Sequence, residues 1–412
     1  MNKRGVAIMS LAHVVDDSYQ GAVPALLPFF VAERHYSYAA VSGLTLAATL
    51  LSSVAQPAFG WWTDRRPHRW LIGAGILTAA AGVGLAGLFA NYAITWFVIA
   101  LSGLGIAAFH PSAARAARQA AGNSNRAMSV FAVGGNAGFA LGSLIATPVL
   151  LVVGLRGTVL LVLPAVAMVT ILAARLTSTL DGPSGGRRSL LPTGEDDWPA
   201  FVRLTTVVVV RAVVFFGLTS FLALYFIHGL HTSKAVGGAA LSTLLVAGAV
   251  GTLLGGWLAD RAGRLITIRT GLACAIPAIA GLVLVSSVPV AFLFATLVGI
   301  ALYMPFSVFV MLGQDYLPNR IGTASGVTVG LAVSVGGLFS PLLGWLADST
   351  SLRLTIAVLM VLPALGLLLS LPMHEPVGHA GPIGDDAAAA IGDAADAADS
   401  AGVLGPDADR SR

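Results

Sequence analysis

Charged residues are scarce in this sequence, and their scarcity argues against a soluble protein. Only 10% of the 412 residues are Asp, Glu, Lys or Arg, and 56% are hydrophobic, whereas a soluble domain carries about 25% charged residues. Cysteine is almost absent: Cys274 stands alone, so the chain cannot form an internal disulfide framework. The sequence also lacks a Walker loop, a metal-spaced Cys/His cluster and a nucleophile elbow. We therefore expect a polytopic membrane protein that is not an enzyme and has no cofactor or metal.

Twelve hydrophobic stretches are long enough to cross a bilayer, for which a helix needs about 20 residues. The first is interpreted as an uncleaved span, because two aspartates and two prolines interrupt a signal-peptide pattern. The predicted spans are 6–31, 39–62, 70–90, 93–114, 127–153, 157–176, 201–228, 236–259, 265–286, 288–311, 322–346 and 352–372.

The longest connection predicts how the chain is divided. Residues 177–200 are rich in Gly, Pro and charge and form a linker between an N-terminal half, 1–176, and a C-terminal half, 201–372. Residues 373–412, rich in Ala, Asp and Gly, are expected to be a disordered cytoplasmic tail.

Lysine and arginine are distributed unequally between the two predicted faces. Fifteen lie on the face that carries the N-terminus and the linker, and only Arg34, Arg156, Lys234 and Arg353 lie on the other. An excess of positive charge marks the cytoplasmic side, so both termini are predicted to be cytoplasmic. This topology explains the basic character of the chain without a nucleic-acid partner.

The two halves repeat one another. The string GWWTDRRPHR at 60–69 reappears as GWLADRAGR at 256–264, an offset of 196 residues, and the same offset relates parts of spans 127–153 and 322–346. Two six-helix halves in parallel orientation are the plan of a transporter whose halves rock about a central site.

On these motifs the chain resembles the major facilitator superfamily. Both halves carry a pattern of Gly, Asp and Arg that is similar to the cytoplasmic loop motif of that superfamily. The residues are Gly60, Asp64, Arg65 and Arg69 in the first half and Gly256, Asp260, Arg261 and Arg264 in the second. The resemblance implies an all-α integral membrane fold of twelve helices in two pseudosymmetric halves, with the two loops as conformational latches. The fifth span, VGGNAGFALGSLIATP, resembles a glycine-rich antiporter motif but lacks its internal Gly-Pro pair.

A narrower resemblance rests on four further strings. DDSYQGAVPALLPFF, GLGIAAFHPSAARAA, RAVVFFGLTSFLALYFI and LGQDYLPNRIGTASGVTVGL are similar to the fosmidomycin resistance family of efflux proteins. This resemblance implies export of a small anionic antibiotic of the phosphonate type across a bacterial inner membrane. We expect the protein to act as a monomer.

Polar residues within the spans are the candidate functional residues. His13, Asp16, Asp17 and Gln20 follow i, i+3, i+4, i+7 spacing and share one helix face. A charge at mid-membrane costs about 2.5–3.5 kcal/mol on insertion scales. Arg211 lies one residue from the repeat equivalent of Asp16, so acid and base are predicted at similar depth. Such groups face a water-filled cavity or an ionic partner.

These residues allow a structural and a functional interpretation. A buried salt bridge could fix helix packing, but such a pair is often no more stabilising than apolar contacts, so we favour proton coupling by Asp16, Asp17 and His13. Adjacent acids titrate as a pair; Asp17 is the preferred carrier. His13 suits a proton relay and a packing role equally. Arg211 has a planar guanidinium that can bind a carboxylate or phosphonate group of a substrate. It could equally be the internal ionic partner of Asp16 or Asp17.

The remaining candidates and the direction of transport stay open at this point. His110, which precedes Pro111, suits either the site or a helix kink. The other predicted substrate-binding residues are Gln20, Asn136, Tyr225 and Tyr303. Embedded acids serve proton-coupled uptake of an organic anion as well as export, and only the family resemblance favours export.

Overall fold

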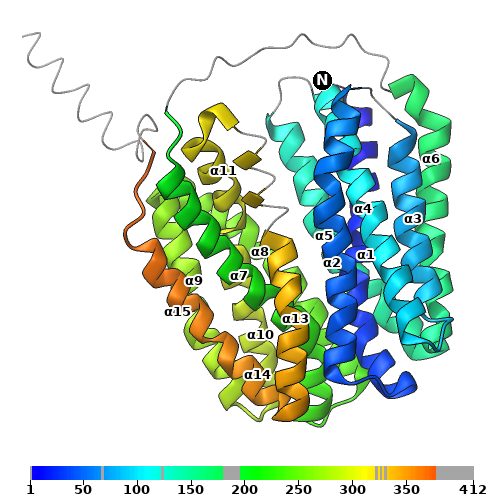
Figure 1. Ribbon diagram of the computed structural model, residues 1–412, viewed down its shortest axis with the longest axis vertical. Coiled ribbons are helices and arrows are strands. Elements are labelled where there is room, and N and C mark those ends of the chain that lie inside the picture. The colour runs from blue at the N-terminus through cyan, green and yellow to red at the C-terminus, as the bar shows by residue number, and fades with distance from the viewer. Residues whose placement is uncertain are drawn as a thin grey trace, which may run out of the picture.

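The computed structural model describes residues 2–65, 69–121, 125–179, 195–320, 323–324, 327–328 and 332–376. Within these residues every regular element is a helix, which confirms the all-α class. The helices form two bundles that lie side by side, and the chain leaves the first bundle and enters the second at the same end (Figure 1).

The helices of the N-terminal half are α1 (Lys3–Arg34), α2 (Tyr38–Arg65), α3 (Trp70–Ala86), α4 (Tyr92–Ala121), α5 (Asn125–Val153), η1 (Leu155–Val162) and α6 (Leu163–Thr179). Those of the C-terminal half are α7 (Trp198–Leu224), η2 (Tyr225–Gly229), α8 (Lys234–Ala262), α9 (Arg264–Leu284), α10 (Val288–Tyr303), α11 (Phe306–Tyr316), η3 (Pro318–Arg320), α13 (Ala332–Ser349), α14 (Leu352–Leu359) and α15 (Val361–Ser370).

Helices occupy the positions of the predicted spans. Nine helical segments of the described residues are long and apolar enough to cross a membrane, and α3, with 17 residues, is a shorter apolar helix. The other two predicted spans correspond to α1, which packs along α5, and α13, which packs along α2. The chain is therefore a multi-pass membrane protein.

Local residue chemistry moves several helix ends from their predicted positions. The tenth span is broken between Tyr303 and Phe306 and continues to Tyr316 instead of ending at 311. Pro305 lacks a backbone N–H and so interrupts the helical hydrogen bonds. The helix α7 starts at Trp198, not 201, because the Asp197 side chain accepts from the backbone N–H of Ala200 at 3.0 Å.

The predicted tail begins too early. Met373 is only 4% exposed, and the Tyr316 hydroxyl donates to the backbone oxygen of His374 at 2.5 Å. Arg269 donates to the backbone oxygens of Ser370 and Leu371. The chain therefore stays packed on the C-terminal half for several residues past 372, and the rest of the predicted tail, 377–412, lies outside the described residues.

The backbone repeats with the offset seen in the sequence. Among the described residues, His35 and His231 are the two non-glycine residues with positive φ, both at 54°, and they are 196 positions apart. Each follows the helical segment that begins its half. The same offset relates two glycine contacts on a backbone oxygen, Gly103 on Ala48 and Gly299 on Leu244. The two halves are thus pseudosymmetric in their packing as well as in their motifs.

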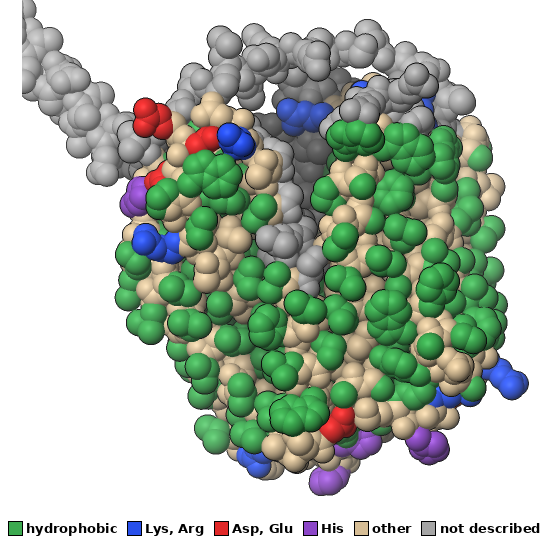
Figure 2. Space-filling view, viewed as in Figure 1, with side chains coloured by type: hydrophobic (Ala, Val, Ile, Leu, Met, Phe, Trp, Pro, Cys, Tyr) green, Lys and Arg blue, Asp and Glu red, His purple; other side chains and the backbone are tan. Residues whose placement is uncertain are grey.

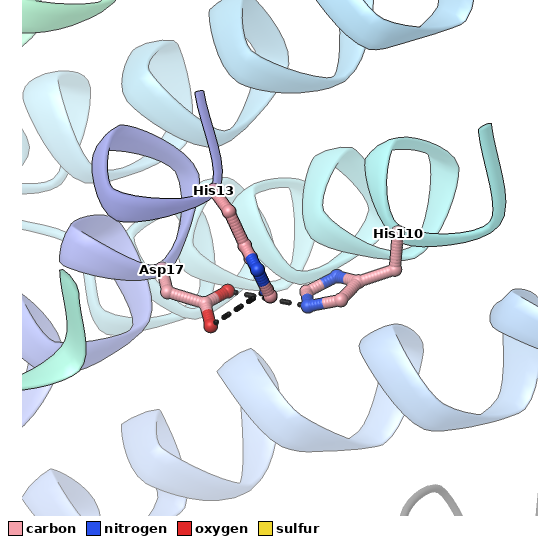
Figure 3. A group of neighbouring side chains, drawn as sticks. All are labelled: His13, Asp17 and His110. Carbon is pink, nitrogen blue, oxygen red and sulfur yellow. Dashed lines mark ion pairs between the residues drawn. The ribbon is translucent and has the colours of Figure 1, made fainter. Parts of the chain in front are cut away.

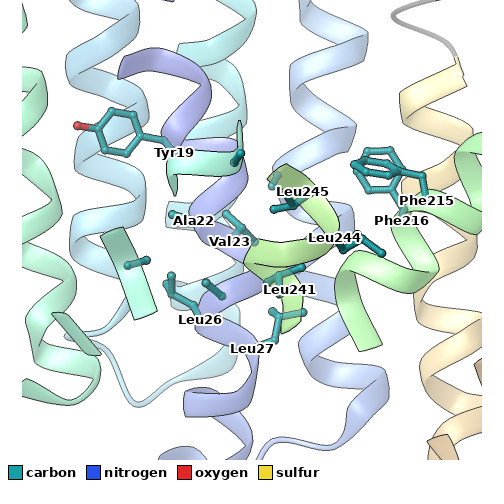
Figure 4. Close-up of a cluster of buried hydrophobic side chains, with 14 of the residues drawn as sticks. Tyr19, Ala22, Val23, Leu26, Leu27, Phe215, Phe216, Leu241, Leu244 and Leu245 are labelled. Atoms are coloured by element: carbon teal, nitrogen blue, oxygen red, sulfur yellow. The ribbon is translucent and has the colours of Figure 1, made fainter. Parts of the chain in front are cut away.

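The halves touch at the end away from the linker. One cluster of buried apolar side chains includes residues of both halves, and in Figure 4 Leu26 and Leu27 of α1 lie beside Leu241 and Leu244 of α8. Near the linker, the C-terminal half has an apolar cluster of its own. Figure 2 shows the surface hollowed between the halves at the linker end. This arrangement is closed at one end and open at the other.

Candidate functional site

One aspartate and two histidines meet in the N-terminal half (Figure 3). Asp17 lies 3.3 Å from Nε2 of His13, one turn earlier on α1, and 3.3 Å from Nε2 of His110 on α4. The two imidazole rings are 5.2 Å apart, edge to face. The side chains of His13 and Asp17 are 9% and 13% exposed. A carboxylate is thus placed between two imidazole nitrogens, each of which can carry a proton.

Backbone carbonyls fix which histidine nitrogen faces Asp17. Nδ1 of His13 donates to the Phe131 oxygen at 2.8 Å, and Nδ1 of His110 donates to the Ile106 oxygen at 2.9 Å. A carbonyl only accepts, so each Nδ1 carries a hydrogen. Nε2, the nitrogen beside Asp17, is therefore where each ring gains or loses a proton.

Asp16 lies behind this cluster in a drier environment. It is 0% exposed, and neither of its carboxylate oxygens has a hydrogen-bond partner among the described residues. Nδ1 of His110 lies 3.9 Å from one of its carboxylate oxygens. The two adjacent acids therefore differ: Asp17 contacts both histidines, and Asp16 is enclosed.

Glycines of α5 allow this part of α1 to approach closely. At Gly134, Gly138 and Gly142 an added methyl group would overlap backbone oxygens of α1. This confirms the close packing that small residues four positions apart permit. Gly135 instead backs the cluster, because a methyl group there would lie 2.6 Å from Asp17 Oδ2 and 2.7 Å from His13 Nε2.

Gly135→Ala is expected to disturb the cluster without unfolding the protein. His13 is stacked on Phe131 with ring centroids 4.3 Å apart, so it has little freedom to yield. Overpacking of this kind costs about 1–3 kcal/mol; if the cluster carries protons, as the sequence predicts, proton flux should fall by about tenfold. Gly73→Ala is the matched control, since its methyl group would meet Val169 at an ordinary 3.7 Å. Equal flux in the two variants would contradict the role of Gly135.

A buried arginine occupies the C-terminal half. Arg211 of α7 is 6% exposed, and its Nε donates to the Leu302 oxygen at 2.5 Å. Its guanidinium lies 5.3–5.8 Å from the ring centroids of Phe215, Tyr303 and Phe306. No carboxylate of a described residue lies within ion-pair distance of it. Cation–π contacts compensate part of the burial cost, and an anion would compensate more.

The two charged sites lie at similar depth and are bridged by one aromatic contact. Asp17 is 14 residues into α1 and Arg211 is 13 residues into α7, about 20 Å from each helix start at 1.5 Å per residue. Phe139 of α5, one turn after Gly135, contacts Phe215 of α7, one turn after Arg211, with centroids 5.8 Å apart. A residue one turn from each site therefore meets its counterpart where the halves touch.

Of the other predicted substrate-binding residues, some lie near the histidine–aspartate cluster and one lies far from Arg211. Gln20 lies half-buried on α1, and Asn136 lies half-buried on α5 beside Gly135. Tyr225 is 1% exposed and donates to the Leu282 oxygen at 3.3 Å. It is 14 residues beyond Arg211 along the same helical segment, about 21 Å at helical rise. Tyr225 is therefore not brought to the site.

The predicted latch of the N-terminal half is only partly described. The side chains of Asp64 and Arg65 lie outside the part of the chain that the structure describes. Gly60 has open space around it, and Arg69 immediately precedes α3. Arg115 of α4 donates to the Thr63 oxygen at 2.6 Å, which ties the end of α2 to α4.

The corresponding residues of the C-terminal half contact their own half. Arg264 pairs with Asp315 of α11 and, at 2.7 Å, with Glu375 beyond α15. Arg261 lies over the Trp257 ring at 4.4 Å, Asp260 is exposed, and Gly256 has open space around it. In this arrangement the ion pairs of Arg264 hold α9, α11 and the chain end together.

Several residues of the two sites were not foreseen from the sequence. Phe215 is one turn from Arg211, so helical spacing could have suggested it. Phe306 is the repeat equivalent of His110, at the offset of 196, and that equivalence was available too. The backbone oxygens of Phe131 and Leu302 carry no sequence signal.

The histidine–aspartate cluster also has the donor set of a metal site. His13, Asp17 and His110 each offer a ligand atom, and these atoms lie within 4.8 Å of one another. Two imidazoles and a carboxylate suit a transition metal. The same atoms suit shared protons, and an experiment with a chelator separates the two uses.

Comparisons with known proteins agree with the geometry. The sequence profile of the Major Facilitator Superfamily matches residues 8–341. The uncharacterized MFS-type transporter YfnC of Bacillus subtilis strain 168 is 33% identical over 383 residues, 88% of this chain and 90% of that protein. The fosmidomycin resistance protein of Escherichia coli K12 is 29% identical over 367 residues, 87% of this chain and 90% of that protein.

Solved structures agree on the fold. A bacterial homolog of the human lysosomal transporter Spinster, in an inward-facing and occupied conformation, has a TM-score of 0.75. It is 17% identical, and the match covers 89% of this chain and 95% of that one. The same homolog in an inward-facing and unoccupied conformation has a TM-score of 0.74.

Proposed function

Because this chain belongs to the Major Facilitator Superfamily, whose members are membrane transporters and not enzymes, we propose that it exports small anionic compounds in exchange for protons. The observation that carries the proposal is Arg211, a buried cation without an acidic partner among the described residues. We propose that Arg211 faces a cluster that can hold protons, Asp17 with His13 and His110. An anion site and a proton site thus share one contact between the halves.

The arrangement favours an anion over an internal ion pair as the partner of Arg211. Asp17 contacts the histidines of its own half, so Arg211 keeps its guanidinium for substrate. The bond from Nε to Leu302 orients the guanidinium, and a planar fork suits carboxylate or phosphonate. Three aromatic rings exclude water around it, which strengthens a charge contact.

Exchange requires that substrate and protons exclude one another. We propose that the substrate places its anion on Arg211 and a hydrogen-bond donor, such as a hydroxyl, on the ionised Asp17 carboxylate. Protons arriving from the opposite side would then neutralise Asp17 and release that donor. Asp16 and His13 complete the set of proton-holding groups, and Tyr303, His110, Gln20 and Asn136 are proposed to line the site.

Uptake is the second candidate, and one observation favours it. A proton taken up by either histidine of the cluster would add positive charge to the site, which would attract an anion and so favour binding of substrate and proton together. The relation to a protein named for fosmidomycin resistance favours export, because resistance follows when a drug is removed. We therefore propose phosphonates of this type as substrates.

The proposal also includes the membrane, the orientation and the moving parts of the protein. We propose a bacterial inner-membrane monomer with both termini in the cytoplasm, so that the open end faces the cytoplasm. Residues 1–176 and 201–372 would be the moving halves, with 177–200 as their linker and 373–412 as a cytoplasmic tail. The two loop motifs would be latches that re-pair when the halves rock.

The direction of proton movement tests this function. Purified protein would be reconstituted in liposomes that contain a pH-sensitive dye, and fosmidomycin would be added outside. Exchange predicts that the lumen becomes alkaline as the phosphonate enters, because protons leave. Acidification would instead establish uptake by symport, and phosphonate entry without any pH change would refute proton coupling. Liposomes without protein give the background.

A further inference from the structure

A single aspartate joins the two halves at the end where they touch. Asp348, near the end of α13, accepts hydrogen bonds from the backbone N–H groups of Tyr38 and Ala39, both at 2.8 Å. These two residues begin α2, which belongs to the other half. The proposed proton and substrate sites do not use this carboxylate.

The start of α2 is suited to hold a carboxylate. The first N–H groups of a helix have no partner within it and carry the positive end of its dipole. Ser37 accepts from the N–H of Ala40 at 3.1 Å, so α2 already has a cap of its own. Asp348 supplies acceptors for two of the donors that remain, through charge-assisted bonds.

Close helix packing brings Asp348 within reach. Gly344, one turn before it on α13, lies against the Ser42 hydroxyl and the backbone of Tyr38 and Ala39, and an added methyl group would overlap them. Gly337 makes a similar contact with Thr49 two turns earlier. The face of α13 that carries these residues is therefore fitted along α2.

The equivalent seam between α5 and α8 lacks such a charge. The repeat equivalent of Asp348 is Val152, which is 86% exposed. That seam is held by a hydroxyl contact of 3.0 Å between Ser143 and Ser242. The N-terminus of α8 is capped by its own Ser233, which accepts from the N–H of Val236 at 3.3 Å. Among the described residues, a carboxylate contact is thus found in the seam between α13 and α2 but not in the seam between α5 and α8.

We propose that Asp348 is a gate residue, which holds this end of the transporter shut while the linker end is open. When the halves rock to open this end, both bonds to α2 must break and the carboxylate must return to water. The contact therefore sets part of the free-energy difference between the two arrangements. This inference rests on rocking of the halves and is independent of the proposed substrate and protons.

Labelling of a buried cysteine tests the gate. Ser42 is 0% exposed within the seam, and Cys274 is the chain's single cysteine, so Ser42→Cys in a Cys274→Ser background gives one reporter. In detergent, where membrane sidedness does not matter, a maleimide would measure how often the seam opens. Asp348→Ala and Asp348→Asn are expected to speed labelling by about fivefold, and Asp348→Glu is expected to keep it slow.

The matched control is Ser351→Ala. Ser351 accepts from the N–H of Leu354 at 3.2 Å, so this change removes a cap just after α13 but within one half. It should leave labelling unchanged, and melting temperatures would exclude misfolded variants. Unchanged labelling in both Asp348→Ala and Asp348→Asn would overturn the proposal, as would equal acceleration by Ser351→Ala. Substrate and pH gradient are absent, so failure here leaves the exchange proposal standing.

Discussion

Replacing Arg211 with alanine is expected to raise the phosphonate concentration at half-maximal flux by at least about 30-fold. Truncating one partner of a buried charge pair costs about 2–5 kcal/mol, and each 1.4 kcal/mol is about tenfold in affinity. Arg211 is 6% exposed and ringed by Phe215, Tyr303 and Phe306, so little water would replace its contact with the anion. Radiolabelled phosphonate uptake into liposomes measures the effect.

A lysine at this position separates charge from geometry. Arg211→Lys keeps the positive charge but loses the planar fork, and we expect it to lie between the parent and Arg211→Ala. Phe306→Leu would keep the apolar wall and remove one cation–π contact, which should cost less than the loss of the cation. If Arg211→Ala binds phosphonate as tightly as the parent, the arginine is structural and the anion site lies elsewhere.

The second large effect is expected at Asp17. In Asp17→Asn, substrate-driven proton flux should fall to the background of empty liposomes, because the group between the two histidines no longer ionises. Phosphonate should still bind through Arg211, but more weakly than in the parent, because the neutral amide no longer offers the substrate's donor an ionised acceptor. Phosphonate movement in the parent should follow an imposed pH gradient, whereas movement in Asp17→Asn should be indifferent to it. Dye fluorescence and radiolabel measured on the same liposomes give both quantities.

Asp16→Asn is the control for this prediction. The residue is adjacent in the chain and identical in chemistry, but it is enclosed and does not lie between the histidines. We expect Asp16→Asn to lower proton flux much less than Asp17→Asn does, because Asp17 remains between the two histidines. Loss in Asp16→Asn with retention in Asp17→Asn would exchange their roles and contradict our assignment. A chelator should have no effect on the parent; loss of activity on chelation, restored by Zn²⁺, would make the cluster a metal site.

The pattern of the sequence determined the fold to a large extent. Long apolar stretches could only be membrane helices, because an unpaired backbone is too costly in lipid. The repeat at an offset of 196 predicted two pseudosymmetric halves. The structure shows the symmetry even at single residues, since His35 and His231 have the same positive φ. Local chemistry fixed the ends that sequence reading misplaced, as with Asp197 before α7 and Pro305 after α10.

The polar residues within the spans were also recognisable from the sequence, because a charged side chain in a membrane helix is energetically costly and therefore rare. Their partners were not. His13 and Asp17 share a face by helical spacing alone, but His110 is 93 positions beyond Asp17 in the sequence. Only packing of α4 against α1 brings its ring to the carboxylate. Our proposal that Arg211 binds an anion, and not an internal acid, likewise rests on where the histidines lie.

Contacts made by the backbone are hidden from sequence reading altogether. Asp348 bonds to two N–H groups that any residue would present, 309 and 310 positions away. The sequence by itself determined which segments cross the membrane and which residues are costly there, since both follow from local composition and spacing. Tertiary structure alone decided which of those residues meet, because pairing across helices depends on how whole faces pack.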